Sequence, residues 1–322
     1  MIGALLRRVV LAVPLIWAVF TLTFLLLELA PGDSASSLLD PELSAAEVAN
    51  TRARWGLDEP ILRRYLAHLA GLARGDLGQS LLLDRPVRDL LVEALPNTLQ
   101  LSIFALVFGQ GLGIVLGGWQ AARHQTPGDH LVSFTTLVVY SLPGFWLALA
   151  LQLLFCLTWN VLPSSGMTDP VLYDTLSWPA RLGDRLQHLI LPGLVLTAGT
   201  AAGDARFMRA TMLEVLDQDY MRTARAKGLS ERAVLWRHGL RNAIAPMFTL
   251  MGMNLPAAFS GAVIVEWVFG WPGMGRLMVT AIQAQDTPVV LGCFSLLTVC
   301  VVIGNLLGDL ACAWADPRVR FA

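Results

Sequence analysis

The sequence is poor in charged residues. Asp, Glu, Lys and Arg make up 15% of its 322 residues, whereas apolar residues make up 55%. Ordinary soluble domains are about 25% charged, so the chain is too apolar for that class. It also lacks Gln-, Ser- or Pro-rich tracts and internal repeats. This composition is typical of a protein that crosses a membrane several times.

Several functional signatures are missing as well. The net charge of −1 argues against a nucleic-acid-binding protein. ATP hydrolysis needs a phosphate-binding G-x-x-x-x-G-K-[ST] loop, and the only lysine, Lys227, stands in another context. An intramembrane enzyme is disfavoured because H-E-x-x-H and G-x-S-x-G are absent and the five histidines are scattered. We therefore expect no catalytic residue, metal or cofactor on this chain.

The four cysteines do not suggest a disulfide framework. All fall in or beside predicted spans, and none lies in an outer loop: Cys156, Cys293, Cys300 and Cys312. We expect them to be packing residues.

Six stretches without charged side chains predict six transmembrane helices. They are residues 9–27, 94–122, 131–168, 189–203, 242–265 and 287–308. Because a span needs roughly 20 apolar residues, the short fourth stretch must extend toward Asp204 and Arg206. The long third stretch is expected to end near Leu157. The first stretch is too long for the apolar core of a signal peptide, so we expect an uncleaved first span.

The basic residues predict the orientation in the membrane. Segment 206–241 holds eight Lys and Arg residues, whereas the loops at 158–188 and 266–286 together hold three. Cytoplasmic flanks carry the excess of such residues, and the two terminal segments are also basic. With six spans, both termini are expected to be cytoplasmic.

The loop between the first two spans, residues 29–93, predicts a helical outer cap. Ser44 and Glu47 form a capping box for one helix, which Gly56 is placed to end. Pro60 begins a second helix, whose apolar residues share one face: Ile61, Tyr65, Leu66, Leu69 and Leu72. The cap is either structural or a docking surface for a partner.

Glycine and proline recur inside the predicted spans. Gly109, Gly113 and Gly117 are spaced four apart, as are Gly304 and Gly308. Such small faces let helices approach closely, either within one subunit or between two. Prolines in spans favour kinks; they are Pro14, Pro143, Pro192 and Pro256.

A basic, helix-forming insert, DYMRTARAKGLSERAVLWRHGLRN, occupies residues 219–242 between two apolar runs. Gly228 divides it into two helices, Ser230 can cap the second, and Leu229 with Val234 can form a hydrophobic staple. An apolar stripe follows at helical spacing: Ala233, Trp236, Leu240 and Ile244. The insert could lie on anionic lipid. Its small residues and central break instead favour a shape that fits a protein cleft.

Long segments of the chain carry a family resemblance. They are LAPGDSA, GLDEPILRRYLAHLAGLARGDLGQS, LPNTLQLS, SLPGFWLAL, HLILPGLVL, RFMRATMLEVLDQDYMRTARAKGLSERAVLWRHGLRNAIAP, VFGWPGMGRLMVTAIQAQDTPVV and DPRVR. These segments resemble the permease subunit of ABC importers of the dipeptide/oligopeptide/nickel class. The resemblance implies an all-α membrane protein of the type I importer permease architecture. Its parts would be a first span at 1–28, the outer loop at 29–93, a permease domain at 94–312 and a cytoplasmic tail at 313–322.

The resemblance also implies a role for the insert. In this family the corresponding loop, here about 206–241, docks into a groove on the ATPase subunit. Ala224 and Gly228 match the last Ala and the Gly of the family's EAA motif, whereas Arg222 and Thr223 stand where Glu and Ala are usual. The residues implied in ATPase coupling are Tyr220, Thr223, Ala224, Ala226, Gly228, Leu229, Arg232 and Leu235.

Partners and substrate follow from the resemblance alone. Separate ATPase subunits would use the ATP, a homologous second permease would complete the pathway, and an extracytoplasmic binding protein would deliver the substrate to the outer loops. The assembly would lie in the bacterial inner membrane. Small peptides are the expected substrate, with nickel chelates and related solutes as alternatives. The alternative function is an ion-coupled secondary transporter, which normally carries an ionisable residue near the middle of a span; the six apolar runs carry none.

An acidic residue at the position of Asp204 is not a usual feature of the family that the chain resembles. We expect it to be solvated near the cytoplasmic end of the fourth span or paired with Arg209, which follows it by five residues.

Overall fold

The structure, a computed structural model, describes residues 2–29, 52, 56, 58–260 and 262–315. Among these, the side chains of 2–9, 255–260, 309 and 311–315 are not described. All regular elements in the described ranges are helical, which confirms the predicted all-α class. The chain divides into two compact units.

The first unit comprises Met1–Thr98 and Pro272–Val302. Its helices are α1 (Ile2–Leu29), α4 (Ile61–Arg74), the start of α5 (Val87–Ala122), α13 (Met274–Gln283) and the first part of α14 (Thr287–Ala315). Buried side chains of α5, α13 and α14 form its main core. The buried Asp286 carboxylate accepts a 2.6 Å hydrogen bond from the Ser80 hydroxyl, which fastens the loop before α5 to the start of α14.

Helix α4 is the described part of the predicted outer cap. It begins directly after Pro60 and ends at Gly75, whose φ of 76° lies in the left-handed region. Three residues of the predicted face, Tyr65, Leu69 and Leu72, pack against a cluster that α1 and α14 form together. The other two residues of that face remain exposed: Ile61 and Leu66. Ser44 and Glu47, the predicted capping box of the first cap helix, lie outside the described residues, whereas Gly56, its predicted end, has a left-handed φ of 67°.

Polar contacts also hold α4 on α1. The Tyr65 and Thr21 hydroxyls are 2.8 Å apart. Arg64 forms an ion pair with Glu28 at 3.1 Å. Helix α4 is therefore fixed to α1 by both apolar and polar contacts.

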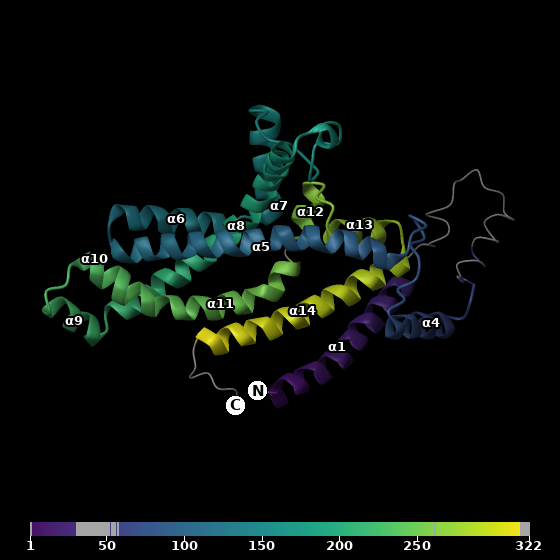
Figure 1. The fold of residues 1–322 in the computed structure, drawn as a ribbon, viewed down its shortest axis with the longest axis horizontal. Coiled ribbons are helices and arrows are strands. Elements are labelled where there is room, and N and C mark those ends of the chain that lie inside the picture. Colours follow the sequence, from purple (N-terminus) through teal and green to yellow (C-terminus); the bar gives the residue numbers. More distant parts are fainter. Residues whose placement is uncertain (1, 30–51, 53–55, 57, 261, 316–322) are drawn as a thin grey trace. The chain divides into compact units, whose positions relative to one another are not determined.

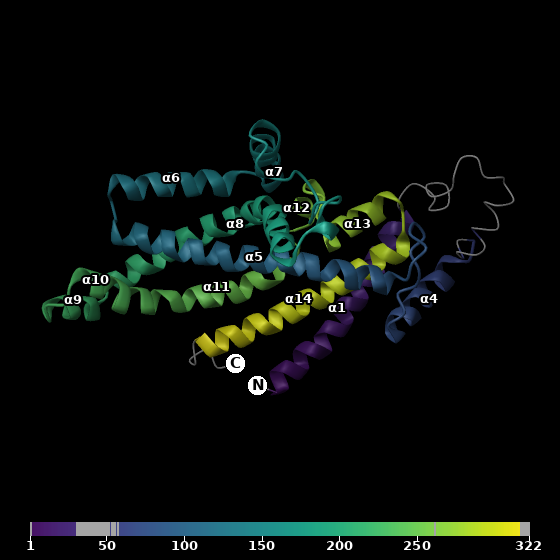
Figure 2. The same ribbon diagram turned by 45° about the horizontal axis from the view of Figure 1, so that its top comes forward.

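The second unit comprises Leu99–Trp271 and Ile303–Ala322. Its longest described helix, α8 (Trp178–Leu216), packs against α6 (Pro127–Ser141), α7 (Gly144–Gln152) and α11 (Leu240–Ser260), as Figures 1 and 2 show. One core surrounds the fully buried Trp271, where α7, α8 and α12 (Val263–Val268) meet. A second core joins Met208 and Met212 of α8 to Ala243 and Met247 of α11.

Four described helices are long and apolar enough to cross a membrane. They are Val10–Leu29, Val87–Ala122, Trp178–Leu216 and Thr287–Gly308. The third of them, α8, continues through Asp204 and Arg206, as the short fourth apolar run required. The predicted fifth run, 242–265, falls on α11 and α12.

A broken helix pair corresponds to the third predicted run. Helix α6 and the segment Gly144–Thr158, which is α7 with its π-helical continuation η1 (Leu153–Thr158), meet at an angle of 101°. The predicted end near Leu157 is confirmed. Pro143 stands at the break, because proline has no N–H to continue the helical ladder. The predicted kink is therefore confirmed at this residue, whereas Pro14 and Pro192 lie inside continuous helices.

The described cysteines are buried and free, as expected of packing residues. They are Cys156, Cys293 and Cys300. The side chain of Cys312 lies outside the described residues.

Glycines set the closest approach between α5 and α8. A Cβ placed on Gly113 would lie 2.5 Å from the Cβ of Asp204, and one on Gly117 would meet the backbone oxygen of Ala205. A Cβ on Gly109 would lie 2.8 Å from the Cβ of Thr200 in α8. In α14, Gly308 likewise meets the backbone of Gly252 in α11. The glycine spacing therefore serves packing within one subunit.

Replacing Gly113 by Val should force α5 away from α8, because no side-chain rearrangement makes room for the new Cβ. Overpacking of this kind costs about 1–3 kcal/mol. We expect a lower midpoint of unfolding for the purified protein in detergent. Gly111→Val is the matched control, since a Cβ at Gly111 has nothing within 4 Å. An equal loss in both variants would contradict this packing.

Candidate functional site

The 219–242 loop forms two short helices joined by a tight turn. Helix α9 (Asp219–Ala226) ends before Gly228, whose φ of 79° favours glycine. The Ser230 hydroxyl accepts a 3.4 Å hydrogen bond from the backbone N–H of Ala233 and caps α10 (Glu231–Ala233). The predicted turn and the predicted cap are both confirmed.

A buried cluster fixes the shape of the loop. Met221 and Val234 are 0% exposed and Ala224 is 7% exposed. They pack together with Leu216 at the end of α8. The Ala224 side chain thus faces the interior of the loop, so any part it plays in docking is through the shape of the loop.

The helix that follows Ser230 is irregular. The segment η3 (Val234–Gly239) is a π-helix, which holds more residues per turn than an α-helix, and α11 continues directly from it. Among residues 234–254 of this helix, the buried positions are Val234, Gly239, Ala243, Met247 and Gly252. The predicted stripe is therefore wrong at Trp236, which is 48% exposed, because the prediction assumed α-helical spacing throughout. Gly239 makes room for Met212 of α8, whose Cε would lie 2.7 Å from a Cβ there.

Most of the residues implied in coupling face outward. The exposed ones are Tyr220, Thr223, Ala226, Gly228, Leu229 and Arg232. Leu235 is half-buried, and Ala224 is the buried member of the set. Tyr220 and Leu229 present large apolar groups, and Trp236, which sequence analysis placed on the packing stripe, joins them. The Tyr220 hydroxyl also accepts a 3.3 Å hydrogen bond from the Asn242 side chain, which ties α9 to α11.

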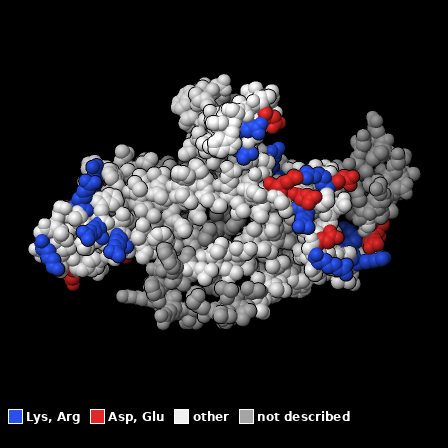
Figure 3. Space-filling model, viewed as in Figure 1, with Lys and Arg blue, Asp and Glu red and all other residues white. Residues whose placement is uncertain are grey.

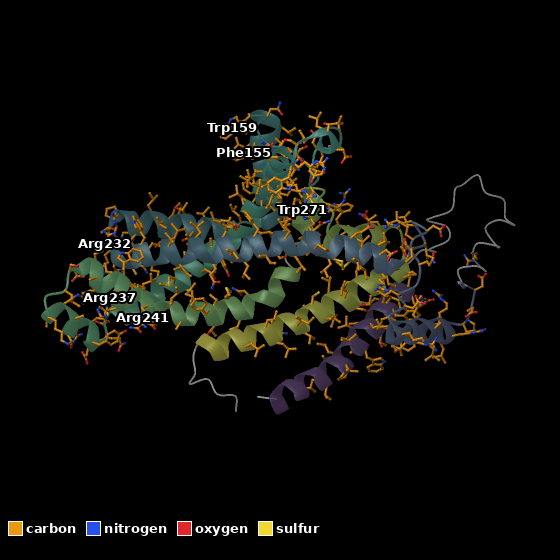
Figure 4. All side chains as sticks on the ribbon, viewed as in Figure 1. Phe155, Trp159, Arg232, Arg237, Arg241 and Trp271 are labelled. Carbon is orange, nitrogen blue, oxygen red and sulfur yellow. The ribbon has the colours of Figure 1, made fainter. Side chains whose placement is uncertain are left out.

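The outer face of the loop is basic. Arg225 pairs with Glu231 at 3.0 Å, and Arg222 lies 3.5 Å from Asp219. Among the described residues, four cations of the loop take part in no ion pair: Lys227, Arg232, Arg237 and Arg241. Figure 3 shows Lys and Arg gathered at this end of the unit, and Figure 4 places the three labelled arginines there. This surface suits an acidic partner.

The two helices that flank the loop, α8 and α11, also line a cavity of about 520 Å³ in the second unit. Parts of α5 and α6 complete its wall. The volume falls within the range of about 300–1,000 Å³ typical of small-molecule sites. Its polar lining residues are Ser102, Tyr140, Thr200, Asp204 and Asn254.

Both expectations for Asp204 are wrong. Arg209 pairs instead with Asp129 of α6, through contacts of 2.8 Å from Nε to Oδ1 and 2.7 Å from Nη2 to Oδ2. Asp204 is 4% exposed in the cavity wall, so it is not solvated at a helix end. The Asp129–Arg209 pair could not be predicted from the sequence because its members are 80 residues apart.

Comparison with known proteins decides the family. The family described as binding-protein-dependent transport system inner membrane component matches residues 113–321, and its N-terminal counterpart matches residues 1–102. The chain belongs to this family. It is a permease subunit of an ATP-driven ABC importer in the bacterial inner membrane, and the ATPase and the binding protein are separate components.

Named relatives cover the whole permease. It is 35% identical to the oligopeptide transport system permease protein AppB of Bacillus subtilis over 322 residues, which is 100% of both chains. It is 35% identical to the dipeptide transport system permease protein DppB of Escherichia coli K12, with 99% of each chain covered. The di/tripeptide permease DppB of Pseudomonas aeruginosa is 36% identical with the same coverage.

Solved structures support the fold of the permease. The inward-facing MetNI methionine ABC transporter is similar with a TM-score of 0.54 and 16% identity, over 70% of this chain and 96% of that chain. An amino acid ABC transporter crystallised with histidines gives a TM-score of 0.51 and 15% identity, over 70% and 94% of the two chains. At this level of identity the likeness concerns the fold alone.

Replacing Gly228 by Val should distort the turn of the permease loop. Because a Cβ there meets nothing within 4 Å, the cost comes from the backbone conformation, about 1–2 kcal/mol for an L-residue. We expect substrate uptake by cells to fall several-fold. Gly228→Asn should retain most uptake, since Asn tolerates this conformation. Equal uptake by the two variants would show that the turn geometry is unimportant.

Removing Arg209 should destabilise the permease, because the Asp129 carboxylate, 1% exposed, would lose its cation. Breaking a buried pair on one side costs roughly 3–5 kcal/mol. We expect Arg209→Met to lower the free energy of unfolding in detergent by about this amount, and Asp129→Asn in the same protein to restore part of it. Arg222→Met, at a 68% exposed side chain, is the control. A loss that Asp129→Asn does not relieve would argue against the pair.

Proposed function

We propose that the permease carries short peptides and couples to its ATPase through the 219–242 loop. The observation that supports this most directly is that α8 and α11 both flank the loop and both line the cavity. A force applied to the loop would reach the cavity walls without an intermediate element. A near-complete switch between two states needs roughly 5.5 kcal/mol of differential interaction, so docking must be firm.

The proposed docking surface is the exposed face of the loop. Its members are those carried over from the family: Tyr220, Thr223, Ala226, Gly228, Leu229, Arg232 and Leu235, with Ala224 acting through the internal cluster. We add Trp236, which is 48% exposed. Large apolar groups surrounded by unpaired cations fit a groove with an apolar floor and an acidic rim.

Peptides are proposed as the substrate because the relatives named above are oligopeptide, dipeptide and di/tripeptide permeases. Nickel chelates, which the resemblance also allowed, have no counterpart in those names. The binding protein is proposed to dock on the outer loop at 29–93, of which α4 is the described helix.

The assembly and the topology are proposals of the same kind. A homologous second permease would complete the pathway, with six spans in this chain and both termini in the cytoplasm. The count of six treats the bent α6–α7 pair as one span and α11 as another. The proposed parts remain 1–28, 29–93, 94–312 and 313–322.

An acid at an exposed docking position should release the ATPase without unfolding the permease. Leu229 is 41% exposed, so Leu229→Asp removes an apolar contact and introduces repulsion against an acidic groove. We expect the ATPase subunit to be lost when the tagged permease is purified in mild detergent, and peptide uptake to fall at least tenfold. Leu172→Asp is the control, because Leu172 is 54% exposed and lies outside the 219–242 loop. This variant should retain both the ATPase subunit and peptide uptake.

Retention of the ATPase and of uptake in Leu229→Asp would contradict the docking role. Uptake that persists after the ATPase is deleted would contradict coupling as a whole and restore the ion-coupled alternative.

A further inference from the structure

One face of α8 forms a wall of the cavity in the second unit. Its lining residues recur every three or four positions, as the residues on one helical face do. They are Leu196, Gly199, Thr200, Gly203, Asp204 and Phe207. A Cβ on Gly199 would have nothing within 4 Å, so the wall is open one turn before Asp204.

Asp204 is the acidic residue of this lining. It is 4% exposed, and within the described part of the chain no hydrogen bond or ion pair involves its carboxylate. Gly113 of α5 provides the space that the Asp204 side chain needs at the helix crossing. Burying a carboxylate is unfavourable unless a cation or several donors reach it. An acidic group inside a membrane span usually marks the route of a substrate or an ion.

The chain itself supplies no cation to Asp204 among its described residues. Arg209 is held by Asp129 at 2.7 and 2.8 Å, and the Arg206 guanidinium lies 5.5 Å from the ring centroid of Tyr140. A divalent metal does not fit, since it takes several charged or polar ligands and no group of three His, Cys, Asp or Glu gathers in the described residues. A primary ammonium, with three N–H donors, suits one carboxylate with neutral acceptors beside it.

We propose that Asp204 binds the α-ammonium group of a peptide as the peptide crosses the membrane. The inference rests on the proposed peptide function. Thr200 and Asn254 provide further oxygen acceptors in the lining. Apolar lining residues such as Leu250 would accept side chains of different shape. The site would thus recognise the charged end that peptides share and discriminate little among their side chains.

The test is protection of a cavity thiol in the purified importer complex without the binding protein. Gly199→Cys places a reactive thiol in the cavity, and the described native cysteines are buried. The rate of its alkylation by a maleimide is measured with trialanine and with N-acetyl-trialanine. We expect trialanine to give half-maximal protection at about one tenth of the concentration that N-acetyl-trialanine requires, or less. A hydrogen bond to a charged group contributes binding free energy on that scale. Asp204→Asn should abolish the difference, whereas Glu214→Gln, at an exposed site on α8, should keep it.

Equal protection by the two peptides, protection by neither, or a difference that survives Asp204→Asn would overturn the proposal. Loss of the second permease from the Asp204→Asn complex would also overturn it, since the carboxylate would then pair with that subunit. Uptake of trialanine by the unaltered importer distinguishes a failure of the proposed peptide function from a failure of the proposed Asp204 site. Absent uptake would refute the peptide function itself, whereas uptake that Asp204→Asn leaves unchanged would refute the Asp204 site alone.

Discussion

The close approach of α5 to α8 is the contact on which the second unit depends. At Gly109, Gly113 and Gly117 the two helices leave no room for a side chain. Within a bilayer, helices gain little from burying apolar groups that lipid would also solvate, so close packing has to hold them together. The placement of α8 fixes the cavity wall, the Asp129–Arg209 pair that joins α8 to α6, and the point where the 219–242 loop begins.

Helix α8 connects the cavity of the second unit to the 219–242 loop. Its end contributes Leu216 to the cluster that shapes the loop, and Asp204, about three turns earlier, faces the cavity. On the other side of the loop, α11 runs from the packed Ala243 and Met247 to Asn254 in the cavity wall. The loop therefore needs no contact with substrate. In the proposed coupling, a displacement imposed on the loop by the ATPase would change the cavity through two helices that are packed together.

Features set by neighbouring residues could be predicted from the sequence, and those set by distant ones could not. Gly228 marked the loop turn and Pro143 the helix break because each residue restricts its own backbone. The orientation of Trp236 was missed, since a π-helix shifts the register without any signal in the apolar spacing. The burial of Asp204 was also missed, because it depends on Gly113 in another helix. The family resemblance predicted a coupling role for the 219–242 loop but gave no role to that carboxylate.

Site-directed photocross-linking from the loop tests the central claim most directly. A photoreactive amino acid would replace Leu229, which is 41% exposed on the proposed docking face, in the assembled importer. The account predicts a cross-link to the ATPase subunit that is absent when the same group replaces Leu172. Cross-links from position 229 to lipid alone, in an importer that still couples ATP hydrolysis to uptake, would contradict it.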